Sequence, residues 1–64
     1  MDKVVYQAIL HPLLQSINHA APDGETQRKF VELVHEMEMS GVPDKEILTS
    51  LIGRLYDGMQ YGNW

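Results

Sequence analysis

Glu32 and His35 form a Glu-x-x-His unit, the spacing that places a carboxylate and an imidazole on one face of a helix. Di-iron proteins of the helical-bundle type build their metal site from two such units and two further glutamates. A dimer would double the unit, but the first twenty residues contain no glutamate, and Glu46 falls near a helix end. Because glutamate is common on helix surfaces, we interpret this unit as a solvated face and expect no metal and no cofactor.

Other groups that could do acid–base or nucleophilic chemistry lack the partners that such chemistry needs. His11, His19 and His35 have no acidic or nucleophilic residue at a characteristic spacing. Neither the serines nor Thr49 stands in a nucleophile motif, and no glycine-rich phosphate loop occurs. A chain of 64 residues also has little room for a closed pocket. We therefore expect that the protein is not an enzyme.

Length and charge narrow the class of protein further. The 64 residues allow a single small helical domain, 1–64, and a chain of this size buries only about 60% of its unfolded surface. Without cysteine it has neither disulfides nor thiolate metal sites, so self-association as a homodimer is the expected remedy for marginal stability. The net charge is −4 and the five basic residues are scattered, so nucleic acid is not the expected partner.

The sequence also bears on the compartment. No stretch approaches the roughly 20 apolar residues of a transmembrane helix. The first residues, Met1-Asp2-Lys3, lack the basic region and long apolar core of a signal peptide. We therefore expect a cytoplasmic protein without a membrane partner.

The elements that must position these side chains are helices. Asp2 is a suitable N-cap for a first helix over 1–19. Pro12 cannot donate a backbone hydrogen bond, so it either kinks this helix or ends it at Leu10. We favour the second alternative, a break between two short helices with Pro12 opening the second.

A turn at 22–24 separates this region from a predicted helical hairpin over 25–57. The hairpin consists of a helix over 25–40, stopped by a glycine, and a helix over 43–57 that opens at a proline. An Asp-Gly pair ends the last helix, so residues 58–64 form an irregular aromatic tail.

Apolar residues recur along these segments at the i, i+3, i+4, i+7 spacing of helices that bury one face. We therefore expect an all-α fold, a small helical bundle of three short helices, or four if Pro12 breaks the first, completed by homodimerisation. The expected core contains Val5, Ile9, Leu13, Ile17, Phe30, Leu33, Val34, Met37, Ile47, Leu51, Ile52 and Leu55.

The hairpin loosely resembles the small connector regulators of enteric two-component and biofilm signalling. The resemblance lies in an apolar helix at 30–34, a glycine turn at 40–41 and a Leu-rich second helix at 51–55. It covers less than half of the chain. No residue's role is therefore carried over from that family.

The same hairpin matches the spacing of a DNA-binding helix-turn-helix. Met37, Gly41 and Ile47 stand where that motif has a small or apolar residue, a glycine and an apolar residue. A recognition helix over 43–56 would then offer the groove Lys45, Thr49, Ser50 and Arg54. Two acidic residues at its start would face phosphates, which is electrostatically unfavourable. A DNA-binding transcriptional regulator is therefore our alternative hypothesis.

The residues best suited to binding another protein gather towards the end of the chain. Tyrosine and tryptophan dominate interface hot spots, and methionine adapts to irregular surfaces. The candidates are Met39, Tyr56, Met59, Tyr61 and Trp64, although the tail could instead fold back onto a small core. We hypothesise a small non-enzymatic regulator that binds a bacterial or phage-host protein. A structural subunit of a larger complex is the second alternative.

Overall fold

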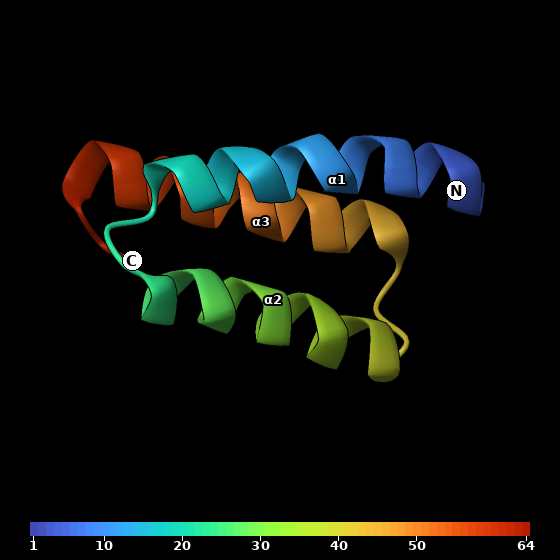
Figure 1. The fold of residues 1–64 in the computed structure, drawn as a ribbon. Helices are drawn as coiled ribbons and strands as arrows, with labels where there is room; N and C mark the ends of the chain where they lie inside the picture. The colour runs from blue at the N-terminus through green and yellow to red at the C-terminus, as the bar shows by residue number, and fades with distance from the viewer.

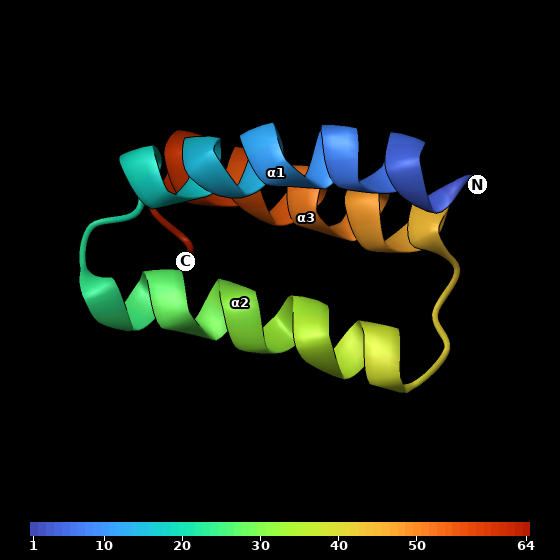
Figure 2. The same cartoon turned by 45° about the vertical axis from the view of Figure 1, so that its right-hand side comes forward.

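Three helices account for most of the chain in the computed structural model, which describes residues 1–64 (Figure 1). They are α1 (Lys3–Ala20), α2 (Gly24–Met39) and α3 (Asp44–Tyr61). Helices α1 and α3 run in the same direction and α2 runs in the opposite one (Figures 1 and 2). The predicted all-α bundle is therefore confirmed, with three helices and no strands. None of the three combines the length and the hydropathy that a bilayer-crossing helix needs.

Helix α1 continues through Pro12, so the favoured break at this position is wrong. Proline removes the hydrogen bond that the carbonyl of Ala8 would otherwise accept, but both residues are exposed and water can replace it. Leu10 on one side of Pro12 and Ile17 on the other are buried in the same core. Their shared packing holds the two halves of α1 in one helix.

Two side-chain caps and two glycines set four of the six helix ends. Asp2 accepts a hydrogen bond from the backbone N–H of Val4 at 2.8 Å, and Asp23 accepts one from Thr26 at 2.8 Å. The hydrogen bond from the Thr26 backbone lowers the pKa of the Asp23 carboxyl below its ordinary value. Gly41, with a φ of 76°, provides the left-handed turn after α2.

The end of α3 differs from the prediction. The helix passes the Asp-Gly pair at 57–58 and ends at Tyr61, one turn later than expected. Gly58 lies within the helix and is buried because the ring of Trp64 covers it. A Cβ at this position would overlap that ring. Gly62, with a φ of 67°, is the residue that stops the helix.

The core lies along the inner faces of all three helices. Its eight buried side chains are Tyr6, Leu10, Ile17, Phe30, Val34, Ile47, Leu48 and Leu51. Five of these were predicted, and four further predicted residues are partly buried against them: Leu13, Leu33, Met37 and Leu55. The predictions for Val5, Ile9 and Ile52 are wrong, since these side chains are 49%, 41% and 55% exposed. The inner stripe of α1 is rotated by about one residue, from Val5 and Ile9 to Tyr6 and Leu10.

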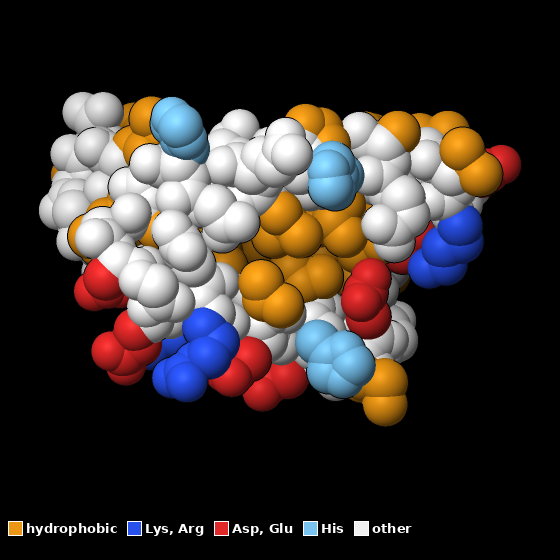
Figure 3. All heavy atoms as spheres, in the orientation of Figure 1, with side chains coloured by type: hydrophobic (Ala, Val, Ile, Leu, Met, Phe, Trp, Pro, Cys, Tyr) orange, Lys and Arg blue, Asp and Glu red, His pale blue; other side chains and the backbone are white.

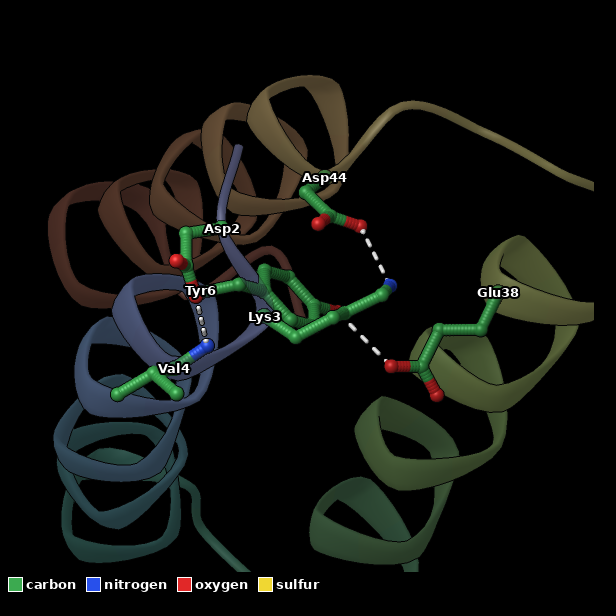
Figure 4. A network of polar contacts seen from close by, with 6 residues as sticks. All are labelled: Asp2, Lys3, Val4, Tyr6, Glu38 and Asp44. Atoms are coloured by element: carbon green, nitrogen blue, oxygen red, sulfur yellow. Dashed lines mark hydrogen bonds and ion pairs between the residues drawn. The ribbon is translucent and has the colours of Figure 1, made fainter.

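Polar contacts tie the three helices together at one end of the bundle (Figure 4). The hydroxyl of Tyr6 in α1 donates a hydrogen bond to Glu38 in α2 at 3.0 Å. The ammonium of Lys3 lies 3.3 Å from Asp44 in α3 and 5.2 Å from the centroid of the Tyr6 ring. Burial, followed by the hydrogen bond to Glu38, raises the pKa of Tyr6 to about 12.

Candidate functional site

Two tyrosines on α3 form an exposed aromatic pair. The rings of Tyr56 and Tyr61 meet edge to face, with centroids 6.2 Å apart and an interplanar angle of 81°. Their side chains are 57% and 70% exposed, so the pair is held by its own contact rather than by the core. Gly53 lies one turn before Tyr56, and a Cβ built on it would meet nothing within 4 Å. The surface beside the pair is therefore bare backbone that a partner chain can approach closely.

Trp64 lies apart from this pair and packs against the core. Its ring meets Phe30 edge to face at 6.2 Å and covers Gly58. The left-handed Gly62 reverses the chain, and its N–H donates to the carbonyl of Gly58 at 2.8 Å. Of the two aromatic residues in the tail, Trp64 therefore folds back onto the core, as the alternative expected, whereas Tyr61 is exposed to solvent.

The two candidate methionines lie far apart. Met39 is the last residue of α2 and is 76% exposed, at the opposite end of the bundle from the C-terminal turns of α3 (Figure 1). Met59 is 67% exposed and borders a shallow hollow on α1. The structure therefore brings Tyr56, Met59 and Tyr61 together on the last turns of α3 and leaves Met39 outside this group.

The residues of the DNA-binding alternative all lie on the exposed surface of α3. They are Lys45, Thr49, Ser50 and Arg54. The hydroxyl of Thr49 donates to the carbonyl of Lys45 at 2.8 Å, within the helix itself. Helices α2 and α3 run side by side in opposite directions (Figures 1 and 2), which differs from the steeply crossed helices of the DNA-binding motif.

The Glu-x-x-His unit faces solvent on α2. Glu32 forms an ion pair with Arg28, one turn earlier, at 3.8 Å, and His35 is also exposed. No three His, Asp or Glu side chains come together in a geometry that could hold a metal ion. The unit therefore has the geometry of an ordinary charged helix surface.

Sequence reasoning missed an apolar surface on the side of α1 and α3 that faces away from α2. Met59 shares its hollow with Pro12 and Ser16 of α1, which places these residues on one side of the bundle. Residues seven apart lie on the same helix face, so Val5 and Ile9 extend this stripe along α1, and Ile52 extends it along α3. We call this surface the outer face and define it by Val5, Ile9, Pro12, Ile52 and Met59.

One signal in the sequence could have revealed the outer face. The run from Val4 to Pro22 contains no Asp, Glu, Lys or Arg, although much of α1 is exposed. In Figure 3 the charged side chains lie mainly over α2 and at the ends of the bundle, while uncharged side chains and histidines cover α1. An exposed helix without charges is typical of a surface that is covered by a partner, because charged residues are depleted in interface cores.

Comparisons with models of protein families, with curated proteins and with solved structures found no match to this chain. A proposal about function therefore rests on the residues of the chain itself. Two surface features are suited to binding, namely the exposed Tyr56–Tyr61 pair and the outer face.

Proposed function

We propose that this protein is a small non-enzymatic regulator that acts in the cytoplasm of a bacterium or phage host by binding another protein. The observation that carries the proposal is the Tyr56–Tyr61 pair, which stands more than half exposed on α3. Regulation would follow from occupancy alone, by covering a surface of the partner or by bridging two partners.

The geometry of the pair suits it to binding. Each tyrosine offers a large ring with an apolar face and a hydroxyl, so it can bury area and still make a hydrogen bond. The contact between Tyr56 and Tyr61 already restricts both side chains, which lowers the entropy that binding must still remove. The open backbone at Gly53 leaves room for a partner side chain to lie against the pair.

Affinity capture from native lysate tests this proposal, using tagged wild type and the variants Tyr56→Ala with Tyr61→Ala, and Met39→Ala. We expect the wild type to retain a stoichiometric protein after nuclease treatment. The double tyrosine variant should lose it by at least about tenfold, because each hot-spot residue is worth about 1 to 2 kcal/mol or more. Met39→Ala removes an exposed apolar side chain at the other end of the bundle and should bind normally.

Two results would contradict the proposal. Equal capture by the tyrosine variant, with its helical content shown intact by circular dichroism, would remove the pair from the mechanism. Recovery of nucleic acid, with proteins lost after nuclease, would favour the helix-turn-helix alternative instead. In that case the double variant Lys45→Ala with Arg54→Ala should weaken binding and flatten its salt dependence.

We also propose that the bundle self-associates as a homodimer. Its core contains only eight buried side chains. The accessible surface of 4487 Å² exceeds the roughly 4,200 Å² that a folded monomer of 7.3 kDa usually shows. Association would cover part of the apolar surface that the single chain leaves open.

A further inference from the structure

We infer that two copies of this chain associate through the outer face, in antiparallel orientation, about a two-fold axis that passes close to Ile52. The inference rests on the proposed self-association and adds its surface and its geometry. Ile52 lies at the middle of α3, which spans Asp44–Tyr61. A residue at the middle of a face that pairs with itself lies close to the two-fold axis.

The five residues that define the outer face are all uncharged. In a two-fold dimer the same surface of both copies meets, so a surface that carries charges of one sign would repel its copy. Helix α1 contributes only uncharged residues from Val4 onward, apart from its histidines. Helix α3 contributes Ile52 and Met59. Lys45 lies seven residues before Ile52 and is the charged residue on the same stripe of α3.

The direction of the helices favours antiparallel association. Because α1 and α3 run in parallel, their N-termini lie together at one end, as the contact between Lys3 and Asp44 shows. The partial positive charges of the two helix dipoles therefore gather at that end and the negative ones at the other. Antiparallel association places opposite ends together, and it brings the Lys45 ammonium towards the C-terminal carbonyls of the other copy's α1.

The shape of the outer face also fits a two-fold pair. The outer face carries protruding apolar side chains at one end, since Val5 and Ile9 are 49% and 41% exposed. At the other end it is hollowed, between the C-terminal half of α1 and Met59. A two-fold axis between these ends places the protruding end of each copy against the hollow of the other, so the same fit is made twice.

The dimensions of the bundle limit the size of the interface. The bundle measures 31 × 20 × 17 Å, so its long faces have projected areas of roughly 500 to 600 Å². A standard stable interface covers about 800 Å² of accessible surface on each partner. The outer face therefore suits a small interface, and we expect association in the micromolar range.

Sedimentation equilibrium of the wild type, Ile52→Asp and Val31→Asp tests the inference. Ile52 and Val31 are matched positions, because both are β-branched helix residues that are 55% and 53% exposed, but Val31 lies on α2. We expect the wild type and Val31→Asp to sediment at twice 7.3 kDa at high concentration. Ile52→Asp should sediment at 7.3 kDa, with its dimer dissociation constant raised at least about 100-fold by two carboxylates that face each other.

The outcomes separate this inference from the proposals before it. If all three proteins remain at 7.3 kDa, self-association itself fails, while the tyrosine-pair proposal is judged by its own capture experiment. If the wild type dimerises and Ile52→Asp does so equally, self-association stands and the outer face is wrong. A loss of the dimer in Val31→Asp as well would also overturn the assignment of the face.

Cross-linking tests the antiparallel geometry separately, since the chain contains no cysteine. Under mild oxidation, Ile52→Cys should form a disulfide-linked dimer, because the two copies of this position meet at the axis. Val31→Cys should remain largely monomeric under the same conditions. Equal cross-linking of both variants, or cross-linking of Val31→Cys alone, would overturn the two-fold arrangement.

Discussion

At the scale of the residue, Tyr6 shows how a tyrosine can be buried in a small core while its one polar side-chain atom stays paired. Val5 and Tyr6 are adjacent and both apolar enough for a core, but Tyr6 is fully buried and Val5 is half exposed. The Tyr6 ring fills the space between the three helices while its hydroxyl still reaches Glu38 at 3.0 Å. The Tyr6 ring buries more apolar area than valine would, and the hydrogen bond to Glu38 means that this burial leaves no polar group unpaired.

We expect Tyr6→Phe to remove a component of the pH dependence of stability. The pKa of Tyr6 is raised to about 12 in the folded protein against an ordinary value of 10.0. Ionisation of Tyr6 therefore favours the unfolded chain. The stabilisation that the protonated hydroxyl gives to the folded protein is complete below pH 10 and is lost as the pH rises towards 12.

Urea unfolding at neutral pH and between pH 10 and 12 measures this effect. Tyr6→Phe should cost about 1 kcal/mol at neutral pH and should lose less stability than the wild type on alkaline titration. Tyr61→Phe, at a 70% exposed position, is the control and should follow the wild type. Parallel alkaline curves for the wild type and Tyr6→Phe would show that the hydroxyl does not couple to folding.

At the scale of the element, α3 contains two glycines whose roles are opposite. Gly53 is exposed, and a Cβ there would meet nothing. Gly58 is buried under Trp64, and a Cβ there would overlap the indole ring. Both glycines weaken the isolated helix equally, so only the packing of Trp64 distinguishes them.

Alanine substitutions at these two positions should therefore change stability in opposite directions. Gly53→Ala should raise the free energy of unfolding by about 0.5 to 1 kcal/mol, because alanine restricts the unfolded chain and fits the helix. Gly58→Ala should lower it by about 1 to 3 kcal/mol, because the Trp64 ring must move from its site on Phe30.

Thermal unfolding measures both changes, and fluorescence of the single tryptophan reports the position of Trp64 directly. The emission should shift to the red in Gly58→Ala and stay unchanged in Gly53→Ala. A stabilised Gly58→Ala variant with wild-type emission would show that Trp64 does not pack on this glycine in solution.

At the scale of the whole molecule, the distribution of charge and apolar surface separates two sides of the bundle. Helix α1 carries no Asp, Glu, Lys or Arg after Lys3, whereas α2 and α3 both carry several. The outer face of α1 and α3 presents exposed apolar side chains. A small domain with an exposed apolar face gains stability when that face is covered.

We expect the melting temperature of the wild type to rise with protein concentration, because an association that occurs only in the folded state stabilises by mass action. Scanning calorimetry or circular dichroism from 5-fold below to 5-fold above the dissociation constant measures this, where the gain is on the order of 1 kcal/mol. Ile52→Asp should melt at one temperature throughout. A wild type without concentration dependence would be inconsistent with a folded-state dimer.

The spacing of residues along the chain was sufficient to predict the all-α class, the hairpin and most of the core. These features depend on local periodicity, on turn residues at 22–24 and on Gly41, which act over only a few residues. Tertiary packing decided the rest, because it selects which flank of a helix is buried. It buried Tyr6 in place of Val5, carried α1 through Pro12 and extended α3 beneath Trp64. Each of these outcomes depends on contacts between segments distant in sequence, which local spacing does not contain.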